Sequence, residues 1–102
     1  MPVTSMMKTD EGMGQGNVPI RYDYDVNTAS HTVHFSYDLS RPAEVTFILS
    51  DQQGIVYRKL SKKQPAGSGF TADIDYGGLR KGLYVIYIKV DEEQFVEKFN
   101  NR

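Results

Sequence analysis

Apolar and polar residues alternate along most of the chain with a period of two. Between Val18 and Val26, apolar side chains alternate with Arg21, Asp23 and Asp25. Because successive side chains of a strand point to opposite faces, this pattern predicts a strand with one face in a core and the other in solvent. Similar alternation, the turn residues between segments and one continuous apolar run at residues 83–88 predict six further strands, at residues 33–39, 45–49, 55–60, 70–74, 83–88 and 95–99.

The segments between these strands are rich in turn-forming residues. Asn27–Ser30 favours pairing of the first two strands as a hairpin. Asp51–Gly54 is typical of a tight turn in which glycine takes a positive φ. We expect a loop at Gln64–Gly69 and a second hairpin through Asp91–Glu93. Apolar residues nowhere recur at helical spacing over two turns, so we expect no helix.

The number and spacing of the strands indicate the class of fold. Seven short strands separated by turns predict an all-β fold, an immunoglobulin-like β-sandwich of about seven antiparallel strands, with a small open barrel as the alternative. The most apolar stretch, Leu83–Ile88, is expected at the centre of a sheet. The fourth strand ends in a basic cluster, typical of an edge strand that lysine protects from pairing with other chains. This cluster comprises Arg58, Lys59, Lys62 and Lys63.

The first sixteen residues differ from the rest of the chain. They contain all four Met, three alternating Gly and no aromatic residue, so they can bury little surface. We expect a flexible leader at residues 1–16 and one folded domain at residues 17–102. The glycine run Gly12–Gly16 lacks the preceding strand and following helix that a dinucleotide-binding loop requires.

Composition excludes several classes of function. A chain of 102 residues has room for one domain. Its 12 Lys and Arg stand against 13 Asp and Glu, and this net charge of −1 argues against a general nucleic-acid binder, which would collect cations for phosphates. The longest apolar run, Leu83–Ile88, is too short for a membrane-spanning helix. The absence of cysteine excludes disulfides, a thiolate nucleophile and thiolate zinc sites.

Few residues are arranged for catalysis or for metal binding. His31 and His34, three apart on the second strand, are expected to face opposite sides and so cannot share a metal ion. Gly67–Gly69 lacks the spacing of a serine nucleophile elbow. We therefore expect no enzyme, no catalytic residue and no cofactor.

Two pairs of carboxylates lie at alternating positions. Asp23 and Asp25 share one solvent face of the first strand, and Asp73 and Asp75 share one of the fifth. Outward-facing carboxylates of this kind usually serve to keep a protein soluble. The alternative is a weak calcium site completed by a loop carbonyl.

Ten of the twelve aromatic residues fall into two groups. Seven lie on faces expected to be inward, namely Tyr22, Tyr24, Phe35, Tyr37, Phe47, Tyr84 and Phe99. The pattern leaves the orientation of Tyr57, Tyr76 and Tyr87 open. An exposed tyrosine on a sandwich can stack on a sugar ring, so a carbohydrate-binding role for these three is one hypothesis.

Some motifs resemble known families. The segments Asp51–Leu60 and Leu79–Tyr84, together with Lys98, resemble the C-terminal sorting domains of type IX secretion substrates. Their usual aromatic-Pro-Asn-Pro opening is missing from Gly16–Tyr22. The Val-Pro-Ile sequence in that segment and the Phe-x-x-x-Phe pattern of Phe95–Phe99 are similar to small exported immunoglobulin-like bacterial proteins, classed as a domain of unknown function.

The resemblance implies a sandwich fold and export, with a signal sequence outside this chain. Tyr84 is expected to anchor a corner through its hydroxyl, and Gly82 to permit the sharp turn before it. Our interpretation is a non-enzymatic accessory or binding module in the periplasm or at the cell surface, with a protein or glycan of the envelope as partner. One alternative is a sorting domain in which the export machinery recognises Lys98 and the hairpin at Asp91–Glu93. The other is a carbohydrate-binding module using Tyr57, Tyr76 and Tyr87.

Overall fold

The structure, a computed structural model, describes residues 19–102 as an all-β fold. Within this range there is no helix, and the seven expected strands are confirmed: β2 (Ile20–Asn27), β3 (Thr32–Leu39), β4 (Ala43–Asp51), β5 (Val56–Gln64), β6 (Gly67–Asp75), β7 (Gly82–Val90) and β8 (Glu93–Asn101). The expected leader and its glycine run lie outside the described residues.

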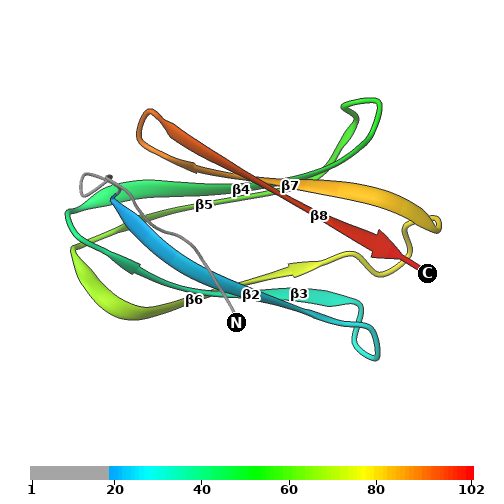
Figure 1. The fold of residues 1–102 in the computed structure, drawn as a ribbon, viewed down its shortest axis with the longest axis horizontal. Coiled ribbons are helices and arrows are strands. Elements are labelled where there is room, and N and C mark those ends of the chain that lie inside the picture. Colours follow the sequence, from blue (N-terminus) through cyan, green and yellow to red (C-terminus); the bar gives the residue numbers. More distant parts are fainter. Residues whose placement is uncertain (1–18) are drawn as a thin grey trace.

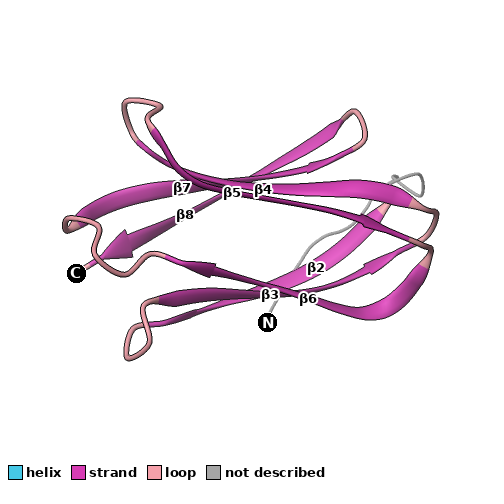
Figure 2. Cartoon of the chain, turned by 180° about the vertical axis from the view of Figure 1, so that it is seen from behind, coloured by secondary structure: helices cyan, strands magenta, loops and turns pink. Residues whose placement is uncertain are grey.

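The strands form two antiparallel sheets that face each other (Figures 1 and 2). One sheet has the order β2-β3-β6, and the other has the order β5-β4-β7-β8. The first two strands pair as a hairpin from Ile20↔Leu39 to Asn27↔Thr32, as expected. Strand β7 lies between β4 and β8, and the basic strand β5 is an edge strand, which confirms both expectations. The fold is therefore an immunoglobulin-like sandwich and not an open barrel.

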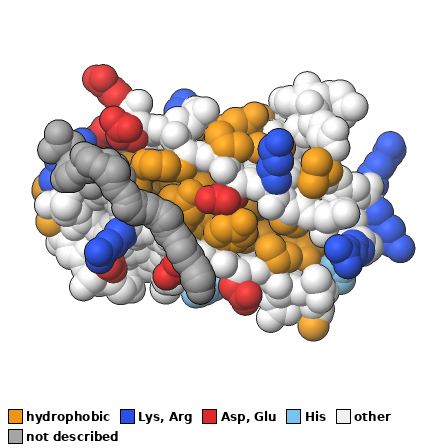
Figure 3. Space-filling model, in the orientation of Figure 1, with side chains coloured by type: hydrophobic (Ala, Val, Ile, Leu, Met, Phe, Trp, Pro, Cys, Tyr) orange, Lys and Arg blue, Asp and Glu red, His pale blue; other side chains and the backbone are white. Residues whose placement is uncertain are grey.

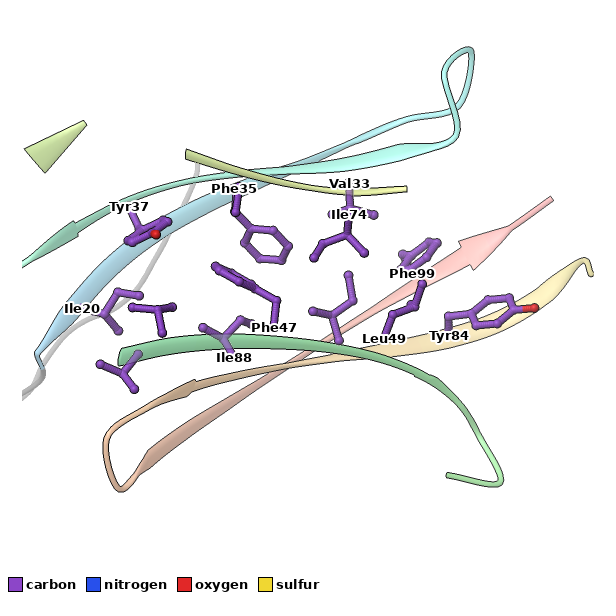
Figure 4. Packing of buried hydrophobic residues seen from close by; sticks show 14 of the residues in the cluster. Ile20, Val33, Phe35, Tyr37, Phe47, Leu49, Ile74, Tyr84, Ile88 and Phe99 are labelled. Carbon is purple, nitrogen blue, oxygen red and sulfur yellow. The ribbon is translucent and has the colours of Figure 1, made fainter. Parts of the chain in front are cut away.

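The core lies between the sheets and is built from the alternating apolar positions. Val33 and Phe35 of β3 and Phe47 and Leu49 of β4 are completely buried. The rings of Phe35 and Phe47 approach from opposite sheets to 4.8 Å between centroids (Figure 4). Burying a side chain of this size stabilises a fold by about 1.5–3 kcal/mol, so each of these four residues contributes substantially to stability.

Local side-chain bonds fix the turns. Asn27 Oδ1 accepts the N–H groups of Ala29 and Ser30 at 3.0 and 3.1 Å, which closes the β2–β3 turn. Gly54 has a φ of +88° in the turn between β4 and β5, as its position in the sequence predicts. Gly82 has a φ of +146° where the chain enters β7. At this corner the Tyr84 hydroxyl donates to the Arg80 carbonyl oxygen, so the corner expectation is confirmed.

Three expectations from the sequence are wrong in detail. Tyr24 is 39% exposed instead of buried, because β2 is an edge strand and no further strand covers it in the described structure. The expected loop Gln64–Gly69 is mostly strand, because β5 continues to Gln64 and β6 begins at Gly67. His31 lies in the β2–β3 turn with a φ of +55°, so it does not share a strand with His34.

Candidate binding site on the open side of the sandwich

The two lateral sides of the sandwich differ in how they are closed. On one side, β5 faces β6, and cations of β5 donate hydrogen bonds to backbone carbonyls at that edge. Arg58 Nε donates to the Asp75 carbonyl at 3.0 Å, and Lys62 Nζ donates to the Thr71 carbonyl at 3.3 Å. Arg58 Nη2 also donates to the Gly77 carbonyl at 3.3 Å. These bonds join the two sheets along the β5/β6 side.

The opposite side, between β2 and β8, is formed by half-buried aromatic residues. We call this surface the β2/β8 seam and define it by Tyr22, Tyr24 and Val26 of β2 and by Phe95 and Glu97 of β8. The three β2 residues pair in register with core residues of β3, and so they point between the sheets. Figure 3 shows a strip of hydrophobic side chains on this side, with an acidic side chain within it.

Aromatic contacts hold the rings of the seam in place. Tyr22 packs edge-on against Phe95 with ring centroids 5.8 Å apart, which connects β2 to β8. Tyr24 stacks on Phe35 at 5.7 Å, so its inner side rests on the core while the ring stays partly exposed. Offset and edge-on pairs of this kind add to the energy of apolar burial. The seam therefore presents ordered rings.

Glu97 places a carboxylate at the centre of these rings. The Tyr22 hydroxyl donates to Glu97 Oε2 at 2.5 Å. Burial raises the pKa of Tyr22 far above its usual range, and the hydrogen bond to Glu97 and its negative charge add to the shift. Burial also raises the pKa of Tyr24, again with a contribution from Glu97. Both phenols consequently stay protonated donors at neutral pH.

The tyrosines proposed from the sequence do not come together. Tyr57 is 37% exposed, and its hydroxyl donates to Asp51 Oδ2 at 2.8 Å while its ring packs edge-on against Tyr84. Tyr76 is only 1% exposed, with its ring 4.9 Å from that of Phe99. The hypothesis that Tyr76 stacks on a sugar is therefore wrong, because its ring belongs to the core.

Tyr87 and Lys98 lie on the outer face of the four-stranded sheet. Tyr87 stands in register between Ile48 of β4 and Val96 of β8, and it is half-buried by these neighbours. Lys98 is exposed on the same face. The structure therefore separates Tyr57, Tyr76 and Tyr87, and a sugar platform that uses all three is not formed.

The outer face of the three-stranded sheet holds a shallow polar depression. His34 lies in register between Asp25 of β2 and Asp73 of β6, and its Nδ1 is 2.6 Å from Asp73 Oδ1. Among residues 19–102, no group of three or more His, Cys, Asp or Glu side chains is placed to hold a metal ion. The depression is lined by Asp25, Asn27, Ser30, Thr32, His34, Asp73 and Asp75.

Asp51 has a structural role in the β4–β5 turn. Its Oδ1 accepts the N–H groups of Ile55 and Gln53, both at 2.9 Å. The bond from Ile55 is the largest cause of a lowered pKa for the Asp51 carboxyl, and the Tyr57 hydroxyl lowers it further. Asp51 and Tyr57 thus stabilise a turn.

The seam is the feature that reasoning from the sequence missed. Tyr22 and Tyr24 were expected in the core, and Glu97 was not singled out. The available signal was the alternation Phe95, Glu97, Phe99, which places a carboxylate on a core-facing position of β8. A charged side chain at such a position usually needs a partner, and this one lies beside tyrosines at an open edge.

No protein-family model matches the chain, and a search of curated proteins gives no match. In the part of the chain that the structure describes, no helix has the length and hydropathy required to cross a membrane.

Proposed function

We propose that this protein is a non-enzymatic binding module, exported to the cell envelope, whose contact surface is the β2/β8 seam. The observation that supports this role is the position of Glu97, which accepts a hydrogen bond from Tyr22 and stands beside the partly exposed Tyr24. Ordered aromatic rings around one polar group are typical of recognition surfaces, because the rings give contact area and the polar group gives orientation.

The chemistry of the seam supports recognition. Its groups are two protonated phenols, one carboxylate and apolar side chains, which provide contacts and hydrogen bonds. The β5/β6 side lacks this character, because Arg58 and Lys62 cover it and donate to backbone carbonyls. The two sides of one sandwich thus differ, and the seam is the side suited to a partner.

Site-specific cross-linking tests the use of the seam. The full chain is prepared with p-benzoylphenylalanine in place of Tyr24 and, as a matched control, in place of Tyr57, which has a similar exposed fraction of 37% on a different surface. After irradiation with envelope extract of the native host, we expect a discrete adduct from position 24 alone. The absence of any adduct at position 24, or equal adducts at both positions, would contradict the proposal.

Cell fractionation tests the proposed location. An antibody raised against residues 17–102 is used to probe periplasmic, envelope and cytoplasmic fractions of the native host. We expect a band near 11.6 kDa in the periplasmic or envelope fraction. A band confined to the cytoplasm would contradict export.

A sorting domain is the second candidate function. It is favoured by β8 being an edge strand with Lys98 exposed on it. In that case the same immunoblot should reveal a much larger precursor, with the small fragment present only after export. A single small band in all fractions would argue against this candidate.

A further inference from the structure

We propose that the β2/β8 seam binds an extended basic polypeptide segment, which adds to β8 as a further strand and places a Lys or Arg against Glu97. The use of the seam rests on the proposed function. The strand geometry and the basic character of the partner are additional claims, argued from the edge, the side chains and the charge.

The backbone of β8 offers the first argument. This nine-residue strand pairs with β7 over its whole length, from Gly82↔Asn101 to Val90↔Glu93. It ends the four-stranded sheet, so its outer edge has no strand partner among the described residues. Peptide groups on such an edge can form a ladder with an incoming extended segment, which supplies affinity through main-chain hydrogen bonds.

The side chains of the seam offer the second argument. In an added strand, alternate residues would point inward, over the same space that Phe95 and Glu97 face. An apolar residue there would meet the exposed part of Tyr24 and the edge of Tyr22, which are held by their contacts with Phe35 and Phe95. The residue opposite Glu97 would meet a carboxylate, so a cation fits that position.

Charge offers the third argument. The two strands that border the seam carry four carboxylates and two cations: Asp23, Asp25, Glu93 and Glu97 against Arg21 and Lys98. Of these, Glu97 is the charge that faces inward between apolar groups, where solvent screens a pair least. A basic segment is therefore attracted to this side, and an acidic one is repelled.

The experiment uses the full chain and two synthetic peptides. The first is Lys-Val-Thr-Val-Thr-Lys-Thr-Val-Thr-Val-Lys, in which the central Lys shares one face with the four Val of the strand. The second has Glu in place of the central Lys. Binding is measured by fluorescence anisotropy, and we expect the Glu peptide to bind at least about tenfold more weakly, since a charge-assisted pair is replaced by repulsion.

Variants of the protein locate the effect. Glu97→Gln keeps the shape of the side chain and an acceptor for Tyr22, so the fold should persist, and we expect most of the discrimination between the peptides to disappear. Glu44→Gln makes the same chemical change at an exposed position on β4, away from the seam, and should leave both affinities unchanged. Equal effects of the two variants would overturn the assignment.

Amide hydrogen exchange tests the strand geometry. On addition of the Lys peptide, we expect slower exchange at amides of residues 93–101 and no change in β5. Protection at β5 instead, or no protection with saturating peptide, would overturn strand addition at β8.

Other occupants give different results, each of which overturns the proposal. Failure of the Lys peptide to bind at millimolar concentration would exclude the addition of a basic strand at the seam. In that case an adduct from the cross-linker at position 24 would still support the seam as a contact surface. Binding of a glycan that is abolished by Tyr24→Ala, without peptide binding, assigns the seam to carbohydrate. Concentration-dependent self-association that Glu97→Gln abolishes assigns it to a second copy of this chain.

Discussion

The hydroxyl of Tyr84 donates a hydrogen bond to the carbonyl oxygen of Arg80, 2.5 Å away, across the corner that leads into β7. The Asn101 amide donates to the same carbonyl at 3.1 Å and to the Leu79 carbonyl at 3.2 Å. The corner thus connects the start of β7 to the end of β8. These bonds fix where β8 ends beside the corner, and β8 is the strand that borders the seam.

Removal of the Tyr84 hydroxyl should weaken this corner. We expect Tyr84→Phe to lower the free energy of unfolding by about 1 kcal/mol, because the buried arrangement loses one of two donors to the Arg80 carbonyl. Gly82→Val should cost more, because a φ of +146° is rarely adopted by a β-branched residue. A Cβ at Gly82 meets no atom within 4 Å, so the loss is expected to come mainly from the strained backbone. Unchanged urea midpoints for both variants would contradict the corner assignment.

Truncation of the ring at the centre of the core should be far more costly. Phe47 is completely buried and contacts Phe35 and Tyr37 of the other sheet. We expect Phe47→Ala to lower the free energy of unfolding by about 3–5 kcal/mol, through lost burial and the cavity left behind. Val96→Ala is the control, because Val96 is 46% exposed and should change stability by less than about 0.5 kcal/mol. Thermal and urea unfolding measure the stability of both variants. Similar losses of stability in Phe47→Ala and Val96→Ala would contradict the packing described.

The cations that close the β5/β6 side should contribute modestly. Arg58→Ala removes the donors to the Asp75 and Gly77 carbonyls, and we expect a loss of about 0.5–1 kcal/mol because these bonds are partly exposed to solvent. Lys59→Ala tests a neighbouring cation on the outer face of β5, where no such bond forms to β6, and it should be nearly neutral. If Lys59→Ala proved as destabilising as Arg58→Ala, net charge and not the joining of the sheets would be responsible.

The tyrosines of the seam should make the protein sensitive to alkali. The pKa of Tyr22 and that of Tyr24 are raised in the folded state, mainly by burial, above the value of about 10 expected when unfolded. The folded state therefore holds these protons more tightly, so their contribution to stability is complete below about pH 10 and is lost as the pH rises above it. We expect the urea midpoint to begin to fall near about pH 10 and to keep falling as the pH rises further.

The Tyr22→Phe variant provides the control for this pH dependence. It removes one hydroxyl whose pKa is raised in the folded state, so its urea midpoint should fall less steeply with rising pH than that of the unmodified protein. Ultraviolet titration measures phenol ionisation directly. Ionisation of every tyrosine near pH 10 in a protein that is still folded would contradict the burial of Tyr22.

Much of the fold could be predicted from the alternation of residues. All seven strands, the hairpin of β2 with β3, the edge position of β5 and the interior position of β7 are confirmed. Each depends on information local in the sequence: the period of two, the turn residues, and the density of Lys or apolar side chains on one strand. The corner bond of Tyr84 also spans only four residues, and so it was open to prediction.

The candidate site could hardly be predicted from the alternation of residues. Alternation assigns Tyr24 and Phe35 equally to the inner side of their strands, yet Phe35 is completely buried and Tyr24 is 39% exposed. The difference arises because β3 has strands on both sides and β2 has one on a single side. Tyr76 shows the converse, since its burial depends on contact with Phe99, far away in the sequence.

The sequence by itself determined which residues form strands and which side of each strand faces the core, because both follow from the alternation of neighbouring side chains. Only the tertiary structure decided that β2 and β8 are the edge strands of the open side, and hence that Tyr22 meets Glu97 across 75 positions of sequence. Pairing of distant strands depends on the free energy of the whole arrangement of sheets, and no local pattern encodes it.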